Sequence, residues 1–227
     1  VAFEQAAQGS PSASTLYRLG SLLVKTGQTT KARAAYERAL ALQPDLAEAG
    51  NDLGTLLAEG GDLPGAIARF RAALAATPDY PDALNNLGYA LLLTDQPAEA
   101  RELYERALEI QPDFPEALNN LGLILGRQGE FDRSEPFFRK ALEKRPGYGE
   151  AANNLALVLV ARGQPEEAIR LLLGVLETNP ASESTYITLA RIYLAADRRN
   201  EGLAIVDRLL QRNPAHPLAL EISRQFR

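Results

Sequence analysis

The sequence predicts an all-α protein built as a solenoid, and two observations carry this prediction. The first is the hexapeptide Ala-Leu-Asn-Asn-Leu-Gly at residues 83–88, which returns unchanged at 117–122 and in related form at 49–54 and 151–156. The spacing is 34 residues each time, a period typical of stacked units that bury their apolar faces only against one another. The second is a proline near the end of every period, after two stretches whose apolar residues have helical spacing.

Six full repeats fit this frame, and positions 1 to 34 are counted below from the first residue of each. They occupy residues 13–46, 47–80, 81–114, 115–148, 149–182 and 183–216. Residues 1–12 fit the end of a preceding, truncated repeat, and residues 217–227 fit a final capping helix. Because the chain begins inside a repeat and has no methionine at residue 1, we expect it to be a piece of a longer protein.

Each repeat is expected to form two helices. Helix A should run from about position 2 to 14, with apolar residues at positions 4, 7, 8 and 11, and helix B from about position 18 to 30. Position 15 is glycine in four repeats, as a left-handed helix exit prefers, and Asp95 and Asp197 stand there in the other two. Pro136, at position 22, predicts that helix B of the fourth repeat begins late or kinks.

Small and large residues recur at fixed positions of the repeat. Position 8 is Gly or Ala, position 20 is mostly Ala, position 24 is aromatic in the first four repeats, and position 32 is always Pro. With Leu at position 7 and Ala at position 27 in most repeats, this pattern resembles the tetratricopeptide repeat family over essentially the whole chain. The resemblance implies a right-handed superhelix of antiparallel helix pairs that acts as a non-catalytic scaffold for a protein or peptide partner.

The composition excludes several classes of function. With 46% apolar and 23% charged residues and no long apolar run, the chain is not expected to span a membrane. A net charge of −5 without a basic cluster argues against nucleic acid. There is no cysteine, and the single histidine, His216, is expected to be solvated, so we predict no metal, no cofactor and no catalysis. Cytoplasm is the expected compartment, with the periplasm or a membrane tether in a missing segment as alternatives.

Polar side chains mark the candidate binding face. On a helical wheel, positions 2, 5, 6, 9, 12 and 13 of helix A lie together, and in the tetratricopeptide family this arc lines the concave surface. An asparagine inside a helix costs about 0.5–0.7 kcal/mol relative to alanine, so the six in repeats three to five imply a compensating contact. The candidates at positions 5 and 6 are Asn85, Asn86, Asn119, Asn120, Asn153 and Asn154, with Asp52 at position 6 of repeat two.

Two interpretations of these asparagines stay open. In the first, the position-6 carboxamides Asn86, Asn120 and Asn154 bind the backbone of an extended peptide. This ladder is similar to the one in the superhelical repeats of O-linked N-acetylglucosamine transferase. In the second, one asparagine per repeat bonds to a neighbouring helix and keeps the stack in register.

Apolar residues on the same arc favour a docked partner. Tyr89 and Leu123 at position 9 are the best candidates, whereas Leu92 and Val160 at position 12 could equally pack against the next repeat. Two other functions remain possible: self-association through the open ends of the solenoid, and recruitment of substrate for a larger enzyme such as a glycosyltransferase.

Acidic residues recur at position 2, for example Glu48 and Glu116. Because aspartates precede three of them at capping-box spacing, we expect these carboxylates to cap helix A rather than select a basic ligand.

Overall fold

The computed structural model describes residues 11–226, in which there are thirteen α-helices and no strand. Helix A of successive repeats is α2 (Ala13–Lys25), α4 (Ala47–Glu59), α6 (Pro81–Leu93), α8 (Pro115–Arg127), α10 (Gly149–Ala161) and α12 (Glu183–Ala195). Helix B is α3 (Thr29–Leu42), α5 (Leu63–Ala76), α7 (Pro97–Ile110), α9 (Phe131–Lys144), α11 (Pro165–Thr178) and α13 (Arg199–Arg212), and α14 (Pro217–Phe226) follows. The helix expected before residue 11 lies outside the described residues.

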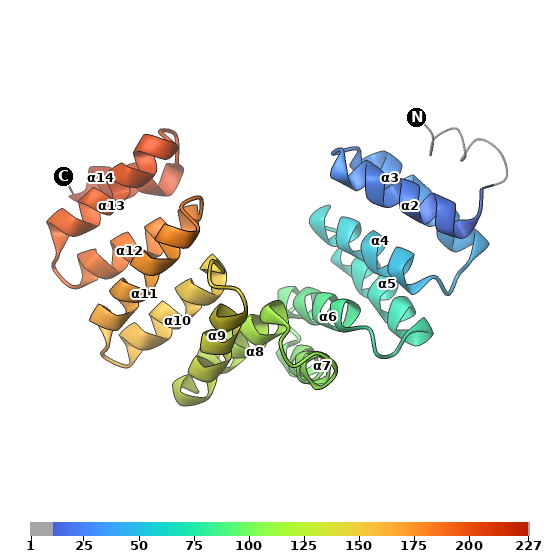
Figure 1. Ribbon diagram of the computed structural model, residues 1–227, viewed down its shortest axis with the longest axis horizontal. Coiled ribbons are helices and arrows are strands. Elements are labelled where there is room, and N and C mark those ends of the chain that lie inside the picture. The colour runs from blue at the N-terminus through green and yellow to red at the C-terminus, as the bar shows by residue number, and fades with distance from the viewer. Residues whose placement is uncertain (1–10, 227) are drawn as a thin grey trace. The chain divides into compact units, whose positions relative to one another are not determined.

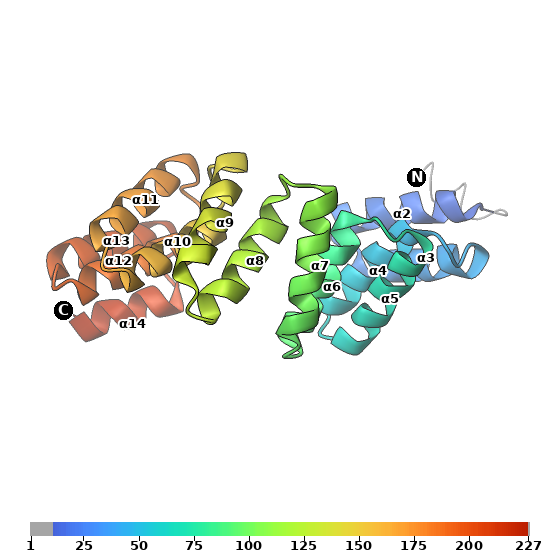
Figure 2. The ribbon, with the colours of Figure 1, turned by 90° about the horizontal axis from the view of Figure 1, so that it is seen from below.

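The chain divides into two compact units, Val1–Pro112 and Asp113–Arg227. Within each unit, helix A packs against helix B of its own repeat, and helix B packs against helix A of the next (Figures 1 and 2). Each unit is therefore a stack of helical hairpins, as the repeat pattern predicts.

The helix boundaries follow the repeat frame closely. Helix A covers positions 1 to 13 and helix B positions 17 to 30 in all six repeats, within one residue of the expected limits. Helix α9 begins at Phe131, the same position as the other B helices, so Pro136 does not delay it. The proline lies one turn inside the helix, where it deletes only the bond from its amide to the carbonyl of Asp132.

All six A helices end through a left-handed residue at position 15. The φ angles are 71–85° at the four glycines, 59° at Asp95 and 58° at Asp197. The following amide then donates back to the carbonyl at position 11, for example Gln28 N to Leu23 O at 2.9 Å. This exit is the one expected from the glycines, and the two aspartates adopt the same conformation without the conformational freedom of glycine.

The packing of each hairpin depends on positions 8 and 24. In the first four repeats an aromatic ring lies directly over the position-8 glycine, so close that a Cβ atom at Gly54 would stand 2.6 Å from Phe70 Cε1. In repeats five and six, Ala156 and Ala190 occupy position 8, and the smaller Leu172 and Val206 stand at position 24. A larger residue at position 8 is thus matched by a smaller one at position 24, as close packing requires.

Candidate functional site

The asparagines at positions 5 and 6 have different surroundings. Asn51, Asn85 and Asn119 at position 5 are only 5%, 7% and 3% exposed, whereas Asn86 and Asn154 at position 6 are half-buried. Position 5 therefore points into the stack of helices, and position 6 stands at its surface.

Hydrogen bonds connect the two positions between consecutive repeats. Asn86 Nδ2 donates to Asn51 Oδ1 at 3.0 Å, and Asn154 Nδ2 donates to Asn119 Oδ1 at 2.9 Å. Within a repeat, the position-5 amide donates to the position-6 oxygen, at 3.3 Å from Asn119 to Asn120. A carboxamide buried in the stack thus finds a partner on the next helix A, which is the contact that offsets the poor helix propensity of asparagine.

Asp52 occupies the position-6 site of repeat two and belongs to the same network. It accepts from Asn51 Nδ2 at 3.3 Å and from the Tyr36 hydroxyl at 3.3 Å. Burial raises the pKa of the Asp52 carboxyl, and the bonds from Asn51 and Tyr36 oppose this shift. Burial also raises the pKa of the Tyr36 hydroxyl to about 12.

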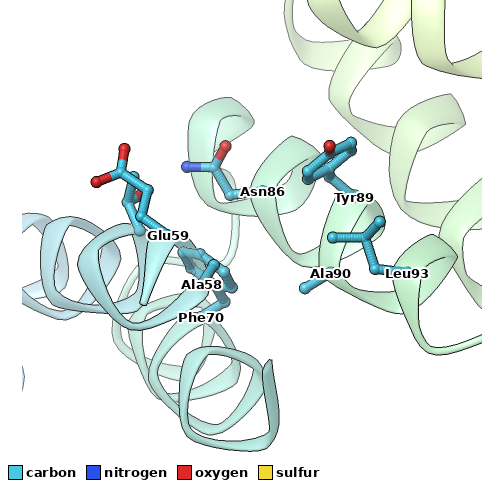
Figure 3. Close-up of a pocket in the computed structure, with 8 residues that line it drawn as sticks. Ala58, Glu59, Phe70, Asn86, Tyr89, Ala90 and Leu93 are labelled. Atoms are coloured by element: carbon cyan, nitrogen blue, oxygen red, sulfur yellow. The ribbon is translucent and has the colours of Figure 1, made fainter. Parts of the chain in front are cut away.

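A pocket of 360 Å³ opens between α4 and α6 of the first unit (Figure 3). The buried ring of Phe70 from α5 forms its floor, and Tyr89 and Leu93, which are 51% and 54% exposed, stand at its rim. Asn86 lies beside them on α6, and Glu59 of α4 stands on the opposite side of the pocket. We call this the N-unit pocket; its remaining lining is Thr55, Ala58 and Ala90.

The second unit holds a pocket of 290 Å³ between α8 and α10. Its lining comes from the same repeat positions, with Phe138 at the floor, Asn154 at position 6 and Leu157, 57% exposed, at position 9. We call this the C-unit pocket; its remaining lining is Leu123, Gly126, Arg127, Phe131, Val158 and Ala161. The repetition of the pocket in a second pair of repeats shows that the repeat architecture itself produces it.

The repeat family was tested by comparison with known proteins. The tetratricopeptide repeat model matches residues 2–47, 17–81, 51–115 and 94–149, and a second model of the same description matches residues 127–184 and 159–222. The chain belongs to the tetratricopeptide repeat family. No curated protein sequence matches it.

Solved structures agree with this tetratricopeptide fold. The APC/C hetero-tetramer Cut9-Hcn1 superposes with a TM-score of 0.84 at 16% identity over 98% of this chain and 44% of that one, so this chain spans less than half its length. PilW, a type IV pilus biogenesis factor, gives a TM-score of 0.82 at 20% identity over 92% and 97% of the two chains. YrrB, described as having an unusual peptide-binding site, gives 0.58 at 22% identity over 84% and 98%. These similarities concern the fold.

The structure separates the predicted site residues of the tetratricopeptide array into two groups. Four of them line the pockets: Asn86, Tyr89, Leu123 and Asn154. The others lie outside the pocket linings: Asp52, Asn85, Asn119, Asn120 and Asn153, whose Nδ2 donates to Ser184 Oγ at 3.1 Å. Leu92 is half-buried, and Val160 packs against the core of its unit, as the packing interpretation expects.

Sequence reasoning missed what opens the pockets. Position 12 is small only in repeats two and four, at Ala58 and Gly126, and both residues line the pocket between their own helix A and the next one. A third pocket, of 320 Å³, lies between α12 and α14; it has Leu194 at position 12 and no aromatic residue from helix B in its lining. The other repeats carry Val24, Leu92, Val160 and Leu194 there. This alternation is visible in the aligned repeats, but its meaning depends on the aromatic floor from helix B, which comes from another part of the repeat.

The expected capping boxes are absent. The N-cap residues of α4, α6 and α8 are Leu46, Tyr80 and Phe114, and no side chain bonds to the amides there. The three aspartates lie one residue too early, and two of them form ion pairs instead, Asp79 with Arg106 at 3.0 Å and Asp113 with Lys144 at 2.9 Å. The carboxylates at position 2 remain in the first turn of helix A, where their negative charge interacts favourably with the positive end of the helix dipole.

His216 is not solvated as expected. Its side chain is 13% exposed, its Nδ1 accepts the amide of Ala219 at 3.3 Å, and its Nε2 lies 3.6 Å from Glu183 Oε2. It therefore caps the start of α14. Within residues 11–226, no three His, Asp or Glu side chains form a metal-binding group, and no helix has the length and apolar character that crossing a bilayer requires.

Proposed function

We propose that this tetratricopeptide repeat chain is a non-catalytic scaffold that binds a peptide or helical segment of a partner protein on its A helices. The observation that supports this most directly is the exposure of Tyr89, Leu93 and Leu157 beside the two pockets. Large apolar side chains grouped at the rim of an apolar pocket are typical of a surface that a partner covers. YrrB, which shares the fold, is described as binding a peptide.

The pockets are suited to apolar side chains of the bound segment. Volumes of 360 and 290 Å³ and floors made by Phe70 and Phe138 suit an aliphatic or aromatic side chain. Exposed aromatic residues and pockets of this kind are where binding energy concentrates in protein interfaces.

The position-6 asparagines are proposed to serve both the stack and the ligand. A carboxamide has two N–H donors and an oxygen that accepts two bonds, and the bond from Asn154 Nδ2 to Asn119 uses only one donor. The half-buried amides of Asn86 and Asn154 can therefore hold the register between repeats and also bind the backbone of a peptide in the adjacent pocket.

The test is selection of a random peptide library, with free and blocked carboxyl termini, on the parent chain and on two variants. Tyr89→Ala and Leu157→Ala remove exposed side chains and should leave the helical content unchanged. The matched control is Leu42→Ala, which removes a side chain 60% exposed on α3, away from both pockets. We expect the selected peptides to bind the pocket variants at least about fivefold more weakly, since a contact at the centre of an interface is worth more than about 1 kcal/mol.

Two results would contradict this proposal. One is a parent chain that selects no peptide. The other is an equal loss of affinity in the control and in the pocket variants, which would place binding elsewhere. Sedimentation over a range of concentrations addresses self-association separately, because a mass that stays at one chain removes that alternative.

A further inference from the structure

We infer that the two pockets select anchors of opposite flanking charge: the N-unit pocket an apolar residue next to Lys or Arg, and the C-unit pocket an apolar residue next to Asp or Glu. The occupant is a peptide segment of a partner protein that carries these anchors. This inference rests on the proposed function and specifies its ligand.

The two pockets are equivalent in construction. Positions 9, 12, 13 and 24 of one repeat and positions 6, 9, 10 and 13 of the next supply the common lining in both units. Both have a carboxamide at position 6 and an aromatic floor at position 24. A difference in ligand preference must therefore come from the few positions at which the two linings differ in chemistry.

The charged position is the main difference. Position 13 is Glu59 in the N-unit pocket and Arg127 in the C-unit pocket, and each is the single charged residue of its lining. Both side chains are exposed, and among residues 11–226 neither has a hydrogen bond or ion pair with another side chain. Each charge is thus available to a ligand and stands where the residue beside an inserted apolar side chain would pass.

Electrostatics at such a rim govern specificity more than affinity. An exposed ion pair is worth up to about 1 kcal/mol, or roughly fivefold in affinity, and replacing attraction by repulsion of similar size doubles the change in free energy. We therefore expect the affinities of peptides with opposite flanking charge to differ by up to about thirtyfold at each pocket, and this difference to shrink as salt is added.

The test uses a peptide library with one Phe or Leu anchor, blocked termini, and Lys, Glu or Gln at the flanking positions. The parent chain should retain both a basic and an acidic class. Glu59→Lys should deplete the basic class, and Arg127→Glu the acidic class. The matched control is Lys25→Glu, which reverses a charge at the same repeat position in α2, beside Val24 instead of a small residue, and should leave both classes unchanged.

Pocket-filling variants identify which pocket each class occupies. Ala58→Leu and Gly126→Leu introduce the residue that repeat three carries at position 12, Leu92. A Cβ atom at Gly126 meets no heavy atom closer than 3.8 Å, and leucine is a better helix former than glycine, so the Gly126→Leu variant should fold. Ala58→Leu should remove only the basic class, and Gly126→Leu only the acidic class.

The outcomes separate this inference from the proposal on which it rests. If Tyr89→Ala and Leu157→Ala weaken binding while the charge reversals leave the flanking preference unchanged, the pockets bind peptide without reading charge, and the inference is wrong. If either filling variant removes both classes equally, the assignment of one class to each pocket is wrong. If Tyr89→Ala and Leu157→Ala have no effect on peptide binding, the proposed function itself is wrong.

Discussion

The pairing of a glycine with an aromatic ring predicts a measurable coupling between positions 8 and 24. In the second repeat, a Cβ atom added at Gly54 would lie 2.6, 2.8 and 3.0 Å from three carbons of the Phe70 ring, against an ordinary contact distance of 3.4–4 Å. The ring is 1% exposed and is held by the surrounding helices, so it cannot move away freely. Overpacking of this kind typically costs about 1–3 kcal/mol.

Gly54→Ala also gains helix propensity, about 1 kcal/mol, which a control must remove. Gly174→Ala in α11 is this control, because nothing lies within 4 Å of a Cβ atom added at Gly174 and the φ angle of Gly174 is not positive. We expect Gly174→Ala to raise the free energy of unfolding by about 0.5–1 kcal/mol. The free energy of unfolding of Gly54→Ala should be about 1–3 kcal/mol lower than that of Gly174→Ala. Urea unfolding followed by circular dichroism, fitted with a nearest-neighbour repeat model, measures both.

The decisive variant restores the combination found in the fifth repeat, Ala156 with Leu172. Phe70→Leu alone should destabilise by about 1–2.5 kcal/mol through lost apolar burial. In the Gly54→Ala background the same change should cost less, because the smaller side chain makes room for the new methyl group. We expect a coupling energy of about 1–2 kcal/mol. Additivity within about 0.5 kcal/mol would refute the argument that the ring position requires the glycine.

Three further predictions concern the helix exit and the polar network. Asp95→Gly should stabilise the protein by about 0.5–1 kcal/mol, measured by urea unfolding, because glycine adopts the φ of 59° without strain; a destabilised variant would contradict this. Burial raises the pKa of Asp52 in the folded state, so the stability associated with this group is present at low pH and is lost as pH rises through the folded pKa. Asp52→Asn keeps an acceptor oxygen but removes the buried charge, so the variant should be more stable than the parent at pH 7. This difference in the free energy of unfolding should shrink as the pH is lowered towards 4, and an equal difference at all pH values would show that burial of the charge is not its cause. Asn119→Ala should cost about 1–3 kcal/mol by leaving the Nδ2 of Asn154 without its acceptor; thermal unfolding at the level of the parent would show that this bond does not hold the register.

The sequence by itself determined the repeat frame and with it most of the fold. Period, helix limits and the left-handed exit at Gly27 or Asp95 follow from residues that act within one repeat, over contacts a few residues apart. Such local rules are written directly in the spacing of glycine, proline and apolar residues. The family could therefore be inferred before any coordinates.

The tertiary structure decided which polar and apolar residues face a ligand. A helical wheel places positions 5 and 6 on the same arc, yet Asn51 is buried where Asn86 of the next helix A bonds to it, whereas Asn86 itself reaches a pocket. The N-unit and C-unit pockets combine Ala58 or Gly126 at position 12 with a ring from helix B and a rim from the next helix A. Contacts between repeats depend on how the hairpins pack, and a pattern read within one repeat does not contain that information.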